Sequence, residues 1–230
     1  MLPFLPHAVV FDMDGLLIES ETLYRDSFLA ASEEGGHGMK VETYQKVCGS
    51  PWDVITGTIF ADYGADFPMA TFRDAWLRHL GLMMADGVAL KPGVVEILDL
   101  LDRLDIRRAI ATSSRHDSVT RHLGPYDLLR RFDTIVARGD YTEPKPAPMP
   151  YLTAAKRLGF DPGRCLALED SYSGVRSASS AGMMTIMVPD VAPPTEEMRE
   201  RCVAVMGDLH AVARLLSRDA PGEEAYEPSR

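Results

Sequence analysis

The 230-residue chain contains no asparagine, only three cysteines and no long apolar run. Without asparagine it has no acceptor for N-linked glycosylation. The cysteines, Cys48, Cys165 and Cys202, form no C-x-x-C pair and are odd in number, so we expect reduced thiols in a cytoplasmic protein. No apolar run approaches the roughly 18 residues of a membrane span, and residues 1–6 lack the basic region of a signal peptide, so we expect no membrane partner.

Positive charge is scarce as well. The chain has 24 Lys and Arg residues against 34 Asp and Glu residues, which gives a formal net charge of −10. Nucleic-acid-binding proteins usually carry a basic stripe, so nucleic acid is not an expected partner. A small anionic substrate remains compatible with this charge, because a local pocket can hold a cation. The patterns H-x-x-x-H, G-x-x-x-x-G-K and G-x-S-x-G are absent, so no competing metal or catalytic signature is present.

The most informative feature that is present is a short apolar stretch ending in two carboxylates. Residues Ala8–Phe11 predict a buried strand of the kind found in parallel sheets. Asp12 and Asp14 follow it, and side chains two residues apart on an extended segment point the same way. Gly15 allows the chain to turn sharply after them. The sequence therefore predicts two carboxylates at the carboxyl end of a strand, where open α/β sheets place their sites.

Residues 19–88 contain helical periodicity and no convincing strand. We expect one helix over 19–34, a second that opens at Ser50-Pro51 and a third after Pro68. This segment is therefore expected to form a helical cap domain, inserted after the first strand.

From residue 89 the pattern changes to short strands that alternate with helices. Strands are predicted at 108–112, 134–136, 165–168, 185–188 and 204–206, and helices at 94–101, 116–123, 151–158, 174–181 and 209–216. Such alternation predicts an α/β fold with a Rossmann-like, doubly wound parallel sheet, here formed by residues 1–18 and 89–218. Residues 219–230 are polar, hold two prolines and are expected to be disordered.

Polar groups follow four of the predicted strands. They are Asp12 and Asp14, then Thr112-Ser113-Ser114, then Lys145, then Glu169-Asp170-Ser171. Each group alone is explained equally well as a helix cap or a solvated lysine. A parallel sheet, however, brings its strand ends together. Four carboxylates beside one lysine would repel one another, and a hard divalent cation such as Mg²⁺ removes that conflict. A carboxylate next to Mg²⁺ and lysine is suited to nucleophilic phosphoryl transfer.

With these motifs in place, the sequence resembles the haloacid dehalogenase superfamily, in the branch with a helical cap after the first strand. The resemblance covers Val9 to Pro189 and is carried by Phe11–Leu17, Ala111–Ser114, Lys145-Pro146 and Leu168–Ser171. It implies that Asp12 is the nucleophile, which forms an aspartyl-phosphate, and that Asp14 is the general acid and base. It further implies a phosphate site of Thr112, the Ser113 amide and Lys145, a Mg²⁺ site of Asp12, the Asp14 carbonyl and Asp170 with Glu169 close by, and a mobile flap over Leu16–Ser20.

The same resemblance leaves the reaction open between two related classes. Asp14 favours phosphate transfer over dehalogenation, because dehalogenases of the superfamily lack that aspartate. Sugar phosphomutases of the β-phosphoglucomutase type share the core motifs, but where they carry a cap histidine and a cap arginine this chain aligns Tyr24 and Trp52. We therefore prefer a phosphatase to a mutase, although Arg115 and His116 could still supply a second phosphate clamp. Candidate substrate contacts are Glu19, Tyr24, Gly49, Trp52 and Arg115.

A non-enzymatic interpretation also has to be considered. Response-regulator receiver domains combine acidic groups, Thr or Ser, Lys and Mg²⁺ on a parallel sheet, and they signal without turnover. Their acceptor aspartate lies on a later strand, and they have no helical insert. We therefore expect an enzyme that acts as a monomer on a small phosphorylated metabolite, in particular a sugar phosphate or a similar monophosphate.

Overall fold

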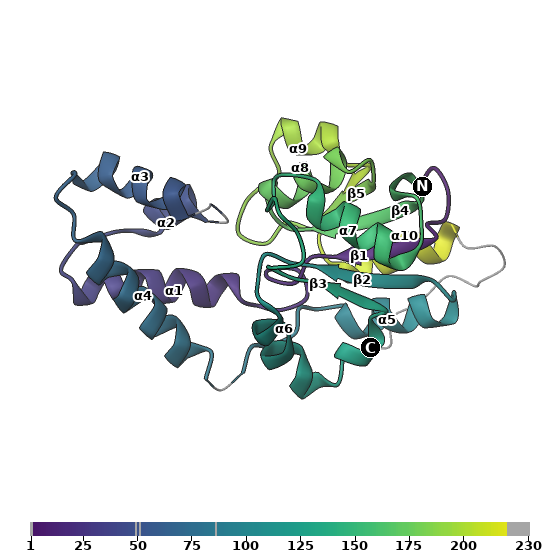
Figure 1. The fold of residues 1–230 in the computed structure, drawn as a ribbon, viewed down its shortest axis with the longest axis horizontal. Helices are drawn as coiled ribbons and strands as arrows, with labels where there is room; N and C mark the ends of the chain where they lie inside the picture. The colour runs from purple at the N-terminus through teal and green to yellow at the C-terminus, as the bar shows by residue number, and fades with distance from the viewer. Residues whose placement is uncertain (1, 49, 51, 86, 220–230) are drawn as a thin grey trace. The chain divides into compact units, whose positions relative to one another are not determined.

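A computed structural model describes the chain except for residues 1, 49, 51, 86 and 220–230. The chain divides into two compact units, Met1–Ile18 with Leu90–Arg230, and Glu19–Ala89 (Figure 1). We call them the core unit and the cap unit. Among the residues that the structure describes, no helix has the length and apolar character needed to cross a membrane.

The core unit is built on a six-stranded sheet in the order β3-β2-β1-β4-β5-β6, with every pair of neighbours parallel. Its strands are β1 (Ala8–Phe11), β2 (Arg107–Ala111), β3 (Thr134–Val136), β4 (Cys165–Glu169), β5 (Met184–Met187) and β6 (Ala204–Val205). The predicted α/β fold with a doubly wound parallel sheet is confirmed. The strand order changes direction between β1 and β4, and ligands of such sheets bind beside that switch point.

Helices cover both faces of this sheet (Figure 1). They are α5 (Val94–Arg103), α6 (His116–Leu123), α7 (Met149–Leu158), α8 (Tyr172–Ser180), α9 (Glu196–Arg201) and α10 (Leu209–Asp219). Helix α7 packs on β1, β2 and β3, whereas α5 packs on α10. The sheet face under α7 is rich in small residues, among them Ala109, Ala111 and Ala167, all fully buried. Small side chains let the helix approach the strands closely. The packing of α7 in turn fixes the segment between Lys145 and the start of that helix.

The cap unit is entirely helical in its described part. It consists of α1 (Glu21–Glu34), α2 (Val41–Val47), α3 (Trp52–Tyr63) and α4 (Met69–Met83). An aromatic cluster holds it together, with Phe28 making edge-on ring contacts to Phe72 and Trp76 at centroid distances of 5.2 and 5.1 Å. The three helices expected from the sequence are present. Pro51, expected at the first position of α3, lies outside the described residues.

Two short helices were missed in the sequence. Helix α2 has seven residues and its N-cap residue, Lys40, offers no side-chain cap. Helix α9 does have a capping threonine, Thr195, which accepts a hydrogen bond from Met198 N, but Met198 is also its one buried residue. Neither segment is long enough to show helical periodicity. Three helix starts also differ from prediction: α1 starts at Glu21 rather than 19, α7 at Met149 rather than 151, and α8 at Tyr172 rather than 174. The earlier start of α7 includes Pro150, because proline fits the first turn of a helix.

The predicted tail, residues 219–230, is described only at Asp219. This residue ends α10, so the helix runs through the first position of the expected disordered segment. The remaining residues of that segment lie outside the described part of the chain.

Candidate active site

The loop after β1 places Asp12 and Asp14 at the switch point. Asp12 N donates to Leu168 O at 3.0 Å, which keeps the loop beside β4, and Leu17 N donates back to Met13 O at 2.8 Å. Gly15 lies at a φ of +80°, a left-handed conformation that glycine adopts without strain. The turn expected at Gly15 is therefore confirmed. Asp12 is only 6% exposed, whereas Asp14 is partly exposed.

Lys145 lies between two buried carboxylates. Its Nζ is 2.6 Å from Asp12 Oδ1 and 2.5 Å from Glu169 Oε1. The three residues come from different segments of the chain, at the ends of β1 and β4 and in the loop before α7. The structure thus brings together residues that are 133 and 24 positions apart, as the strand-end argument predicts.

The electrostatics of this group are unbalanced towards negative charge. Burial raises the pKa of the Asp12 carboxyl to about 8, with the charges of Glu169 and Asp14 acting in the same direction and Lys145 opposing them. Burial alone would lower the pKa of Lys145, but its attraction to Asp12 and Glu169 raises that pKa overall. The lysine therefore stays charged, and Asp12 needs further positive charge to be a carboxylate at neutral pH.

The carboxylates around Asp12 fit a hard divalent cation. Asp12, Glu169 and Asp170 each offer one oxygen, these oxygens lie within 4.8 Å of one another, and all three residues are buried. Carboxylate oxygens are the ligands that Mg²⁺ and Ca²⁺ prefer. Buried carboxylates at this spacing repel one another unless a cation or protons neutralise them.

Both carboxylate oxygens of Glu169 are already engaged within the fold. Oε1 accepts hydrogen bonds from Lys145 Nζ and, at 2.6 Å, from the Tyr151 hydroxyl. Oε2 accepts from Ser171 N and Ser171 Oγ at 3.2 and 3.1 Å. The carboxylate also fills the space beside Gly174, where an added Cβ would lie 1.8 Å from Oε1. Glu169 is thus fixed in place, and it fixes Lys145 in turn.

Tyr151 and Gly174 were not identified from the sequence as site residues. Tyr151 is fully buried in α7 and reads as core from its apolar neighbours. Gly174 gave a usable signal, since a glycine in the first turn of α8 suggests that another group approaches that turn closely.

The loop after β2 surrounds the other aspartate. Ser114 Oγ donates to Asp14 Oδ2 at 2.7 Å, and Thr112 Oγ1 approaches the same oxygen at 3.5 Å. Ser113, between them, is exposed. Ser114 was open to interpretation as a helix cap, but Arg115 holds the N-cap position of α6 and makes no side-chain cap. Ser171, the other open case, does cap its helix, because its Oγ accepts from Gly174 N at 3.1 Å.

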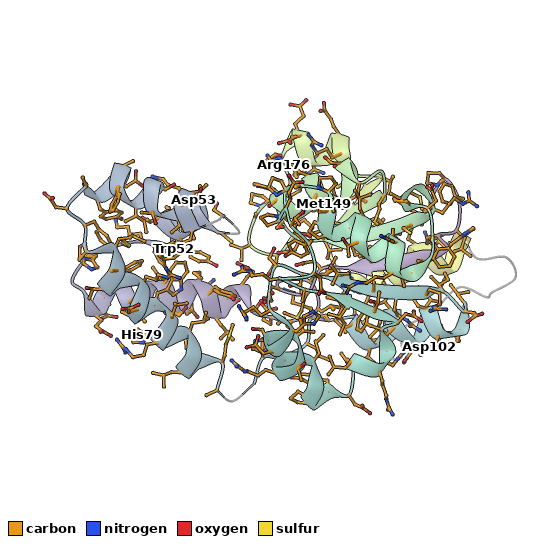
Figure 2. All side chains as sticks on the ribbon, viewed as in Figure 1. Trp52, Asp53, His79, Asp102, Met149 and Arg176 are labelled. Carbon is orange, nitrogen blue, oxygen red and sulfur yellow. The ribbon has the colours of Figure 1, made fainter. Side chains whose placement is uncertain are left out.

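The candidate substrate residues are less clustered. Arg115 is 73% exposed in the core unit, 3.8 Å from Asp117. In the cap unit Glu19 accepts a hydrogen bond from Thr22 at 3.0 Å, and Tyr24 packs against the aromatic cluster. Gly49 lies outside the described residues. Trp52, at the start of α3, points towards α4, where its ring contacts Trp76 at 5.9 Å (Figure 2).

Trp52 has a cationic neighbour that the sequence did not indicate. The guanidinium of Arg73, on α4, lies over its ring at 4.7 Å from the centroid. Lys46, the nearest cation in sequence, is instead 2.6 Å from Asp62. Arg73 lies 21 residues after Trp52 in the sequence, so its position over the Trp52 ring could not be anticipated from neighbours along the chain.

Comparison with known proteins agrees with this geometry. Residues 9–188 match the haloacid dehalogenase-like hydrolase family, more than half of the chain, and the protein belongs to that family of enzymes. A phosphorylated carbohydrates phosphatase from Thermotoga maritima is 28% identical over 78% of this chain and 83% of its own.

Solved structures extend the comparison. The protein CbbY from Rhodobacter sphaeroides, determined in complex with phosphate, is 28% identical with a TM-score of 0.70, over 89% of this chain and 95% of its own. A β-phosphoglucomutase from Clostridium difficile reaches the same TM-score at 20% identity, over 89% and 92% of the two chains, and so shares the fold.

Proposed function

We propose that this protein is a Mg²⁺-dependent phosphatase that hydrolyses a small phosphorylated metabolite, a sugar phosphate or similar monophosphate, through an aspartyl-phosphate on Asp12. The observation that supports the proposal most directly is the position of Asp12. Its carboxylate follows β1 and lies 2.6 Å from Lys145 Nζ, and one of its oxygens lies close to an oxygen of Asp170. The phosphatase from Thermotoga maritima supports the choice of reaction and of substrate class.

The chemistry divides into two steps. In the first, an Asp12 oxygen attacks the phosphorus, the bond to the leaving oxygen breaks, and Asp14 gives that oxygen a proton. In the second, Asp14 takes a proton from water, the hydroxide attacks the phosphorus, and the bond to Asp12 breaks to release inorganic phosphate. Ser114, 2.7 Å from Asp14, orients the carboxyl group for both proton transfers.

The phosphate oxygens need donors throughout these steps. We assign this function to Lys145, Thr112 Oγ1 and the Ser113 amide. Asp12, the Asp14 carbonyl and Asp170 would hold Mg²⁺, with Glu169 beside it and acting through Lys145. The cation, when bound, neutralises the charge that spreads over the transferred phosphoryl group. Residues 19–88 are the proposed cap domain and Leu16–Ser20 the proposed flap.

The proposal is tested by a phosphate-release screen over small phosphorylated metabolites, with and without Mg²⁺. We expect the wild-type protein to hydrolyse at least one sugar phosphate or similar monophosphate. The Asp12→Asn variant should release no more than a trace of phosphate from the same compound. Equal release by Asp12→Asn, tested on protein with an unchanged melting temperature, would show that Asp12 is not the nucleophile.

A sugar phosphomutase is the second candidate, and one observation favours it. Arg73 places a guanidinium beside Trp52, and an arginine is a natural fork for the second phosphate that a mutase must hold. We prefer hydrolysis because Arg73 is engaged with the Trp52 ring. A ³¹P NMR time course with β-glucose 1-phosphate and a trace of the bisphosphate separates the two. Glucose 6-phosphate that accumulates faster than inorganic phosphate, and does so only with Arg73 intact, would identify a mutase.

A further inference from the structure

We propose that Tyr141 is a positioning residue for phosphate binding, whose hydroxyl fixes the Thr112–Ser113 peptide so that the Ser113 N–H faces Asp12. This inference rests on the proposed phosphatase function, since it concerns the same phosphate site. Tyr141 lies in the loop between β3 and α7, four residues before Lys145.

The direction of the Thr112–Ser113 peptide follows from two hydrogen bonds of Thr112. Thr112 N donates to Val136 O at 2.9 Å, on the β3 side of β2. Thr112 O accepts from the hydroxyl of Tyr141 at 3.1 Å, and Tyr141 belongs to the loop that follows β3. In a trans peptide the N–H points opposite to the C=O, so Ser113 N–H points away from β3. The neighbour of β2 on that other side is β1, which is followed directly by Asp12.

The Ser113 N–H is therefore presented to the site and not used within the fold. No acceptor for it lies among the residues that the structure describes. A backbone N–H held in advance at the place where phosphate oxygens gain charge stabilises the transition state without reorganisation.

The two carbonyls that follow are held by the same loop. Ser113 O accepts from Arg138 Nε at 2.9 Å, and Ser114 O from Arg138 N at 2.8 Å. Three successive carbonyls are thus tied to residues 138–141. Burial raises the pKa of the Tyr141 phenol, which keeps its proton available for donation. Without the tyrosine hydroxyl, the Thr112–Ser113 peptide loses the hydrogen bond to its carbonyl, while the next two carbonyls remain held.

The test uses the full-length chain with Mg²⁺ and p-nitrophenyl phosphate, with inorganic phosphate and orthovanadate as competitive inhibitors. Tyr141→Phe removes only the hydroxyl. We expect Ki for orthovanadate to rise about three- to tenfold, and kcat/KM to fall by a similar factor, the usual effect of one neutral hydrogen bond. Arg138→Lys, which keeps the charge but loses the Nε donor, should weaken inhibition in the same direction.

The matched control is Tyr63→Phe, because that hydroxyl also makes one hydrogen bond, with Thr43 Oγ1 at 2.9 Å in the cap unit. It should leave both Ki values unchanged. An unchanged Ki in Tyr141→Phe, with or without a lower melting temperature, would overturn the positioning function and leave the phosphatase proposal intact. A wild-type protein that neither hydrolyses monoesters nor binds orthovanadate would instead refute the phosphatase proposal itself, and this inference with it.

Discussion

Substitution of Gly174 by alanine should inactivate the enzyme through a residue that touches no substrate. An alanine Cβ at this position would lie 1.8 Å from Glu169 Oε1 and 1.9 Å from Cδ. Gly174 does not adopt a positive φ, so the backbone itself accepts alanine without strain. The effect of the substitution therefore arises from the contact with Glu169.

The magnitude follows from how far the carboxylate has to move. An ordinary van der Waals contact requires Glu169 to shift by about 1.5 Å. The shift breaks its bonds to Lys145 and Tyr151, now 2.5 and 2.6 Å long. Overpacking costs about 1–3 kcal/mol, and the loss of charged hydrogen bonds adds about 1.5–3 kcal/mol. Relaxation and the better helix propensity of alanine offset part of this cost, so we expect about 2–4 kcal/mol of destabilisation.

The loss of activity should be larger than the loss of stability suggests. Lys145 is shared by Glu169 and Asp12, so displacement of Glu169 also moves the cation beside the nucleophile. A displacement of about 1 Å at a reacting centre can cost about 100-fold in rate. The assay is kcat with a hydrolysed monophosphate, measured well below the melting temperature, together with the free energy of unfolding from urea titration.

Gly57→Ala is the matched control for Gly174→Ala. Gly57 lies inside α3, and among the described residues no atom other than its chain neighbours and the nearby backbone of its own helix lies within 4 Å of the place where its Cβ would be. Alanine there should stabilise the helix by up to about 1 kcal/mol and leave kcat unchanged. A wild-type rate in folded Gly174→Ala would refute the claim that Glu169 must be held against α8 for Lys145 to function.

Three further outcomes are expected. Excess chelator should abolish turnover, Mg²⁺ should restore it, and Ca²⁺ should bind while supporting little turnover, because its looser coordination does not hold the in-line geometry. Asp14→Asn should keep orthovanadate binding but lower kcat by about 10²–10⁴-fold, the usual contribution of a proton donor. In metal-free protein, the melting temperature of the wild type should fall relative to Asp12→Asn as the pH rises from 4 to 8. The pKa of Asp12 is raised from 3.8 to about 8 in the fold, so between these pH values the folded state binds a proton at Asp12 that the unfolded state does not. The stabilisation that this proton gives the folded state is lost as the pH rises. A constant difference between the two proteins across the window would contradict this.

The parts of the fold that the sequence predicted are those set by short-range pattern. The strand Ala8–Phe11 is recovered to the residue, because a fully buried parallel strand is a continuous apolar run closed by polar groups. The convergence of Asp12, Lys145 and Glu169 was also predictable, since parallel strands bring their ends to one edge. Helices α2 and α9 were not, because α2 spans only seven residues and has no side-chain cap, and α9 buries a single residue, Met198.

The contacts that hold the site in place were beyond the sequence because they depend on helix packing. Tyr151 reaches Glu169 only because α7 lies across β1 and β2, and no spacing in the sequence links the two residues. The cation over Trp52 comes from another helix in the same way. Sequence patterns thus indicate which side chains meet at the carboxyl ends of the strands. They do not indicate which hydrogen-bond donors hold those side chains in place.

The most direct test of the account is to trap the phosphorylated enzyme. The Mg²⁺-loaded protein is mixed with a ³²P-labelled substrate identified in the screen, quenched in acid within the first turnover, and digested for peptide mapping. We predict hydroxylamine-sensitive label on the peptide that contains Asp12, and none in Asp12→Asn. Label on another residue, or phosphate release by Asp12→Asn at the wild-type rate, would contradict a mechanism that proceeds through Asp12.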